Sequence, residues 1–112
     1  MIRVLVAVSP KMYRQTITLF LRSRRPDVKV RSADPLDLQR ECALFEPHLL
    51  VCHDGTPEDA RNRALFLVEI HYSNSLDAVV KANGKDLRIV EDIEIDDLLA
   101  VVEEIEKTVS NE

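Results

Sequence analysis

The sequence has little glycine and only two cysteines, and each shortage excludes a class of protein. Its two glycines, Gly55 and Gly84, are too few for the glycine-rich loop that nucleotide-binding domains place against phosphates. The cysteines, Cys42 and Cys52, lie in separate apolar segments without CxxC spacing, so a disulfide framework has no support. We expect both to be buried thiols of the core.

Long apolar runs and an excess of basic residues are also missing. No run approaches the roughly 18 to 20 apolar residues of a membrane span, and residues 1–8 enter a strand without a signal-peptide pattern. We therefore expect a cytoplasmic protein. Lys and Arg number 15 against 20 Asp and Glu, a net charge of -5, and acids concentrate between Glu91 and Glu106. Because such a surface repels phosphates, neither nucleic acid nor a membrane is an expected partner.

What the sequence does contain is one core and an alternation of strand and helix patterns. A chain of 112 residues with 46% hydrophobic content fits a single domain, residues 1–112. Apolar spacing and capping residues predict the elements of its first half: strands at 2–8, 28–31 and 49–52, with helices between them that start at Ser9 and at Asp34.

The second half alternates less regularly. Residues 53–62 are too short for an ordinary crossover helix, so only a single turn is expected there, before a fourth strand at 64–72. Asn83-Gly84 between apolar segments predicts a β-hairpin at 78–91. The alternative is a short helix over 75–82 with Gly84 as its C-cap. A stripe of apolar residues predicts a last amphipathic helix over 96–109.

Together these elements predict an α/β fold: a flavodoxin-like, doubly wound parallel sheet that is shortened after the third strand and closed by a C-terminal helix. Ligands of such sheets gather beyond the carboxyl ends of the strands, where Cys52, His53 and Asp54 are expected. Adjacent residues of a strand point to opposite faces, so Cys52 and His53 cannot readily form a nucleophile and base pair. The sequence therefore does not predict an enzyme.

Three stretches resemble the receiver domain of bacterial two-component response regulators. They are residues 4–14 (VLVAVSPKMYR), 46–57 (EPHLLVCHDGTP) and 89–99 (IVEDIEIDDLL), which occur at the right places in the order of elements. The resemblance covers residues 2–57 and 88–108, whereas residues 58–87 are shorter than in a receiver and match poorly. It implies a signalling role and a receiver-like fold.

Receivers transfer a phosphoryl group to an aspartate, and the resemblance implies where each part of that machinery would lie. The acidic pair that holds magnesium falls on Val8 and Ser9, which offer at most one neutral oxygen to a cation that prefers carboxylates. The acceptor aspartate falls on His53, with Asp54 one residue later. The lysine that contacts the phosphate falls on Glu91, which repels it instead. The resemblance thus implies a degenerate receiver, a pseudo-receiver that is not phosphorylated.

The leading functional prediction is a phosphorylation-independent regulatory or protein-interaction module that acts as a homodimer. Receivers commonly pair through their last strands and helices, so the resemblance points to the acidic helix 96–109 and to residues 75–90 as the interface. Hairpin strands present edges that invite pairing. The candidate interface residues are Val79, Val80, Leu87 and Ile89.

The alternative prediction is a metal-binding α/β protein. Residues that follow the third, fourth and fifth strands would converge at one edge of the sheet, and imidazole with carboxylate suits a divalent transition metal such as zinc or iron. The candidate ligands are His53, Asp54, His71 and Glu91. No other cofactor is predicted.

Overall fold

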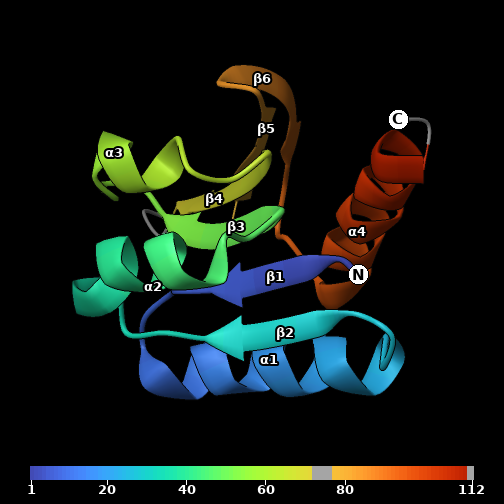
Figure 1. The fold of residues 1–112 in the computed structure, drawn as a ribbon, viewed down its shortest axis with the longest axis horizontal. Coiled ribbons are helices and arrows are strands. Elements are labelled where there is room, and N and C mark those ends of the chain that lie inside the picture. The colour runs from blue at the N-terminus through green and yellow to red at the C-terminus, as the bar shows by residue number, and fades with distance from the viewer. Residues whose placement is uncertain (72–76, 111–112) are drawn as a thin grey trace.

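Six strands and four α-helices make up the part of the protein that the computed structural model describes, residues 1–71 and 77–110 (Figure 1). In chain order the strands are β1 (Arg3–Val6), β2 (Lys29–Ser32), β3 (Leu49–His53), β4 (Phe66–His71), β5 (Asp77–Ala82) and β6 (Lys85–Val90). The helices are α1 (Lys11–Arg24), α2 (Leu38–Phe45), α3 (Glu58–Arg61) and α4 (Ile95–Ser110), with a 3-10 turn at Pro35–Asp37 before α2. Tyr72, the predicted end of the fourth strand, and residues 75 and 76 of the predicted interface lie outside the described residues.

The sheet is mixed, with the strand order β2-β1-β3-β4-β5-β6. Strands β1 to β4 are parallel, whereas β5 runs antiparallel to β4, and β6 antiparallel to β5. The prediction of a parallel sheet is therefore wrong for the last two strands. The five residues between His71 and Asp77 are too few for the crossover that parallel neighbours need, so the chain has to turn back. Because β5 is reversed, β6 again runs in the direction of β4.

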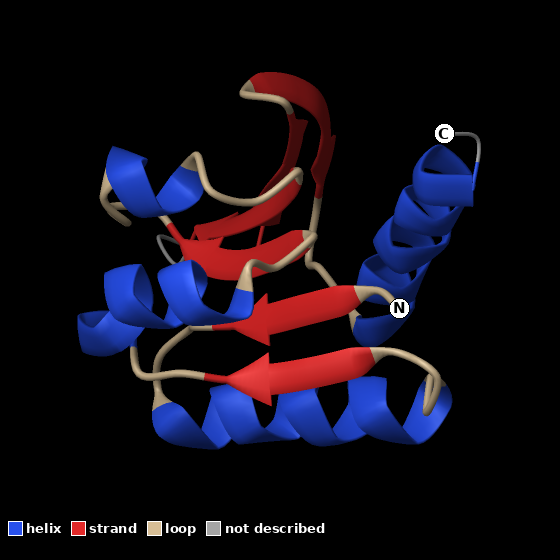
Figure 2. Ribbon diagram, in the orientation of Figure 1, coloured by secondary structure: helices blue, strands red, loops and turns tan. Residues whose placement is uncertain are grey.

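The predicted hairpin is confirmed as β5 and β6, and the helical alternative is wrong over Asp77–Ala82. Its turn residues Asn83 and Gly84 have φ angles of 53° and 78°. A two-residue turn with both φ values positive matches the twist of the strands that it joins. The hairpin extends the sheet past the parallel strands (Figure 2).

A β-bulge interrupts the hairpin. Val80 is aligned with Arg88, but the next residue of β5, Lys81, is aligned with Asp86. Leu87 is therefore an extra residue on β6, the outermost strand. Such an insertion breaks the regular hydrogen-bonding ladder and increases the local twist.

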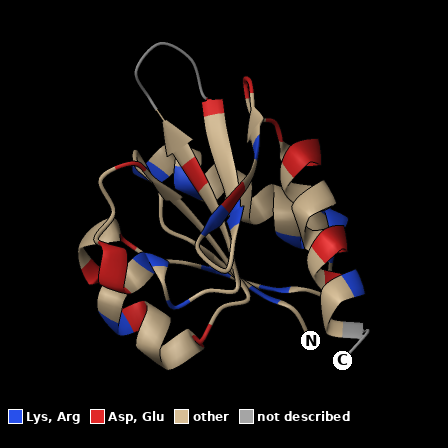
Figure 3. Cartoon of the chain, turned by 90° about the horizontal axis from the view of Figure 1, so that it is seen from above, with Lys and Arg blue, Asp and Glu red and all other residues tan. Residues whose placement is uncertain are grey.

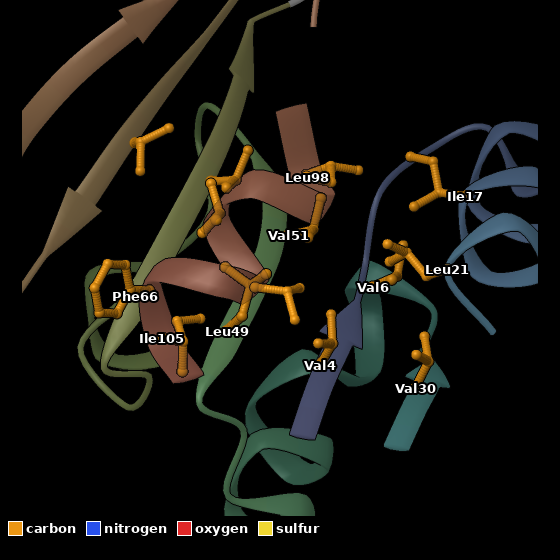
Figure 4. Close-up of a cluster of buried hydrophobic side chains, with 14 of the residues drawn as sticks. Val4, Val6, Ile17, Leu21, Val30, Leu49, Val51, Phe66, Leu98 and Ile105 are labelled. Atoms are coloured by element: carbon orange, nitrogen blue, oxygen red, sulfur yellow. The ribbon is translucent and has the colours of Figure 1, made fainter. Parts of the chain in front are cut away.

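Helices cover both faces of the parallel strands and enclose two apolar cores, because alternate residues of a strand point to opposite faces. On one face α1 and α4 pack against β1, β3 and β4 (Figure 4); the buried side chains include Val4, Val6, Ile17, Leu21, Leu49, Val51, Leu98 and Ile105. On the other face α2 and α3 enclose a smaller core, with Leu5, Leu38, Cys42, Phe45, Leu50, Cys52, Ala60 and Leu67. The predicted final amphipathic helix is thus confirmed as α4.

Two features at the carboxyl ends of β1 and β3 refine the predicted elements. The helix α1 begins at Lys11 with Pro10, not Ser9, as its N-cap, because the Pro10 backbone is still extended (φ -74°, ψ 170°). The carbonyl oxygen of Pro10 already accepts a hydrogen bond from the Arg14 N–H at 3.1 Å. After β3, α3 is the single turn that the short crossover predicts.

Within residues 1–71 and 77–110, no helix combines the length and the apolar character that a membrane crossing requires.

Candidate functional site

The acceptor and magnesium positions implied by the receiver resemblance lie side by side, at the carboxyl ends of β1 and β3. Val6 is aligned with Val51 in this parallel pair, so Val8 and His53 both follow two residues later. The Val8 side chain is wholly buried, whereas Ser9 is exposed and His53 is half-buried. An aliphatic side chain therefore occupies the place where a receiver would hold a carboxylate toward a cation.

The loop after β3 is held in a fixed shape around His53. The Thr56 hydroxyl donates a hydrogen bond to the His53 carbonyl oxygen at 2.6 Å, and Gly55 supplies the left-handed conformation that the turn needs (φ 87°). His53 and Thr56 line a hollow of about 610 Å³ between this loop and the start of α2, together with Leu36 and Arg40. His53 thus lies at the carboxyl end of β3, on the side of the sheet that carries α2.

Cys52 lies inside the protein, on the core side of β3. Its side chain is fully buried in the smaller core, which it shares with the equally buried Cys42. Burial raises the pKa of Cys52 to about 12 and also raises the pKa of Cys42. Because the thiolate is the nucleophilic form, neither cysteine is activated, and the prediction of two core thiols is confirmed.

Asp54 and His71 come together across β3 and β4. The Asp54 N–H donates to the Ile70 carbonyl oxygen at 3.1 Å, which draws the loop after β3 toward the end of β4. Oδ2 of Asp54 then lies 4.0 Å from Nδ1 of His71, an ion pair whenever the imidazole is protonated. Among the four predicted metal ligands, this is the one close side-chain contact that the described residues make.

Glu69, in the middle of β4, is a functional candidate that the sequence interpretation passed over. Its side chain is only 8% exposed, yet two cations, Arg61 and Lys81, and the imidazole of His71 lie beside it. We call these four residues, Arg61, Glu69, His71 and Lys81, the Glu69 cluster. Oε2 of Glu69 accepts a hydrogen bond from Arg61 at 3.0 Å and lies 3.4 Å from Nζ of Lys81. Oε1 lies 3.4 Å from Nε2 of His71.

The signal for the Glu69 cluster was present in the sequence. A single carboxylate interrupts the apolar run Leu65–Ile70, and a buried carboxylate has to be paired with cations to stay ionised. What the sequence does not contain is the identity of the partners. Lys81 is a partner of Glu69 because β5 turns back and pairs with β4. Arg61 is a partner because the short helix α3 places it near β4.

The predicted metal ligands do not converge. Asp54 and Glu69 approach opposite nitrogens of the His71 ring, so one metal ion on that ring would not reach both carboxylates. Glu91 follows β6, and with about 4.8 Å between neighbouring strands it lies about 14 Å from the level of β3 and His53. Among the described residues, no group of three or more His, Cys, Asp or Glu side chains is arranged to hold a metal ion.

The candidate interface residues divide between the two faces of the hairpin. Val80 is fully buried in the core that β5 shares with α4, so its side chain contributes nothing to an exposed surface. Leu87 and Ile89 are exposed, at 51% and 73%, and Val79 is partly buried. An exposed apolar surface therefore exists on the hairpin, formed by Val79, Leu87 and Ile89.

No family model, curated protein or solved structure matches this chain. The likeness to receivers therefore stays a prediction that depends on the three sequence stretches.

Replacing Glu69 by Gln is expected to lower the free energy of unfolding by about 1 to 3 kcal/mol, because Arg61 and Lys81 lose the charge that compensates them while they remain largely buried. Urea denaturation measures the change. The matched control is Glu104→Gln, which removes an exposed ion pair with Arg88 at 2.7 Å and should cost less than about 1 kcal/mol. Equal losses in the two variants would contradict the assigned role of the buried carboxylate.

The Cys52 thiol makes stability depend on pH in the alkaline range. In the unfolded chain the thiol ionises near pH 9, whereas in the folded protein its pKa is raised to about 12. The contribution of the neutral Cys52 thiol to the free energy of unfolding is therefore complete below pH 9. It is lost as the pH rises from 9 toward 12. Urea midpoints should fall over this interval, and less steeply in Cys52→Ala. Parallel pH profiles for the two proteins would show that Cys52 does not cause the fall.

Proposed function

We propose that this protein is a receiver-like protein-interaction module that acts without phosphorylation and as a homodimer, in a regulatory role in the cytoplasm. The order β2-β1-β3-β4 with helices on both faces supports the likeness, because it is the order of the first four strands in flavodoxin-like sheets. The β5–β6 hairpin is where the chain departs from that pattern.

The composition of the carboxyl edge supports a module without phosphoryl chemistry. Magnesium is held by hard oxygen ligands, usually carboxylates, and the receiver positions for them carry the buried Val8 and the neutral Ser9. The position of the phosphate-binding lysine carries Glu91, whose negative charge would oppose a phosphorylated neighbour. A phosphoryl group at this edge would thus lack both of its usual sources of positive charge.

The observation that carries the proposal is the exposed hairpin. Where a parallel sheet would end in a strand covered by helices, this sheet ends in β6, all of whose residues except Val90 are exposed and two of whose exposed residues are Leu87 and Ile89. Soluble domains seldom leave apolar side chains gathered on an outer strand unless another surface covers them. Contact between the hairpins of two copies would cover these side chains, and this is the role that we propose for β5 and β6.

The first test concerns phosphorylation. Incubation with acetyl phosphate and Mg²⁺ should leave the protein unlabelled, because no carboxylate occupies the acceptor position or the position of the magnesium ligands. Intact-mass spectrometry would reveal an added phosphoryl group, and a receiver with the complete acidic set serves as the positive control. Rapid labelling that depends on Mg²⁺ and is lost in Asp54→Asn would overturn the proposal.

The second test concerns the oligomeric state. Light scattering is expected to give a mass of about twice the 12.8 kDa of one chain. Ile89→Lys should shift the protein toward the monomer, since it places a charge in the apolar surface. Leu44→Lys, at an exposed leucine of α2, is the matched control and should leave the mass unchanged. A wild-type protein that remains a monomer at high concentration would refute the homodimer.

A further inference from the structure

The strand β2 is the outermost one at the end of the sheet opposite the hairpin. In its parallel pair with β1, the Lys29 N–H donates a hydrogen bond to the Ile2 carbonyl oxygen at 2.9 Å, and Ala33 bonds to the β1 side in the same way farther along the chain. Because alternate residues of a parallel strand face the same neighbour, the backbone N–H and C=O groups of Val30 and Ser32 point away from the sheet. Groups of this kind form a template to which another strand can pair.

The outward carbonyl group of Val30 is covered by a side chain of α1. This helix runs beside β2 (Figure 1), and Nε and Nη2 of its Arg22 donate hydrogen bonds to the Val30 carbonyl oxygen at 3.1 and 2.8 Å. Hydrogen bonds from a charged donor are stronger than those from a neutral N–H group. Val30 as a whole is only 6% exposed. The acceptor that an added strand would need is therefore already occupied.

Arg22 differs in this contact from the other two arginines at the end of α1. Arg24 lies 3.9 Å from Asp96, and Arg25 forms an ion pair with Glu106 at 2.6 Å. Among the described residues Arg22 forms no ion pair, and both of its hydrogen bonds go to the backbone of β2. Its guanidinium group is thus directed at the edge of the sheet and not at an acid.

The charges of β2 act in the same direction as this contact. Acidic residues are frequent on α4 (Figure 3), whereas the charged residues of β2 are both basic, Lys29 and Arg31. Arg31 forms an ion pair with Glu41 at 2.9 Å, and Nζ of Lys29 lies 5.8 Å from the centre of the Phe45 ring. Cations on an outermost strand repel an identical strand, an effect that salt screens. When salt screens these charges, the hydrogen bonds of Arg22 remain as the barrier to pairing.

We infer that the edge of β2 is a strand-accepting surface that Arg22 holds closed. The occupant that Arg22 excludes is β2 of a second copy of the chain, running antiparallel. Residues whose N–H and C=O groups both point outward exchange hydrogen bonds in such a pair, so Val30 and Ser32 of one copy match those of the other. Rotation of the Arg22 side chain opens the edge without any change in the strand. The contact is autoinhibitory, and it concerns the end of the sheet opposite the proposed dimer contact.

The first test removes the contact with Arg22→Ala. Alanine is a good helix former, so the variant should stay folded, which circular dichroism verifies. The measurement is made in about 0.5 M NaCl, where the Debye length of about 4 Å screens the charges of Lys29 and Arg31. There the variant should contain about tenfold more material that is heavier than the wild-type species, as measured by light scattering. Arg24→Ala, at the same end of α1, is the matched control and should give wild-type masses.

The second test locates the association. Pairing through β2 should slow the deuterium exchange of the Val30 and Ser32 amides in Arg22→Ala and leave the amides of β6 as they are. Adding Ser32→Pro removes an outward N–H group while the bonds to β1 remain, so the double variant should return to wild-type masses. Wild-type masses for Arg22→Ala overturn the inference. Association that leaves the exchange of both amides unchanged, or that persists in a folded double variant, overturns it as well, because it arises at another surface.

Discussion

Glu69 and the side chains around it, Arg61, His71 and Lys81, join three elements of the second half of the chain. The carboxylate lies on β4, Lys81 on the reversed strand β5, and Arg61 on the one-turn helix α3. The chain spends too few residues between β3 and β4 to cover this face of the sheet with a full helix. Ion pairs with the buried carboxylate add there to the apolar packing of Ala60 and Leu67, and their strength depends on all partners staying in position. The hairpin, the short crossover and the end of β4 are thereby coupled.

The parallel half of the fold could be predicted because its signals are local. In each element the apolar pattern of a few neighbouring residues predicts which side chains are buried. This holds for the strands β1 and β3, for Leu38, Cys42 and Phe45 of α2, and for the amphipathic α4. The hairpin was equally legible, since Asn83-Gly84 is specific for a tight turn. The error about sheet direction came from extending the regular alternation past β4, where only five residues separate the strands.

The site was harder to predict, because its composition depends on pairing between distant strands. Sequence order alone placed Glu91 after a fifth strand and so beside His53, but the reversed strand β5 lies between and moves Glu91 outward. The same insertion brings Lys81 to Glu69, a contact for which the sequence has no local sign. Asp54 and His71 were expected at one edge and do meet, since β3 and β4 are adjacent and parallel. Position along a strand was thus predictable, whereas lateral position in the sheet was not.

Leu87 has a consequence for how far assembly can proceed. An outermost strand with an unbroken row of backbone groups accepts another strand, whose own free side accepts the next, and growth of this kind has no natural end. One additional residue in β6 spoils that row. A contact through the side chains of a single face, in contrast, leaves no further surface of that kind once a partner covers it. The insertion thereby works against open-ended growth of the sheet at β6.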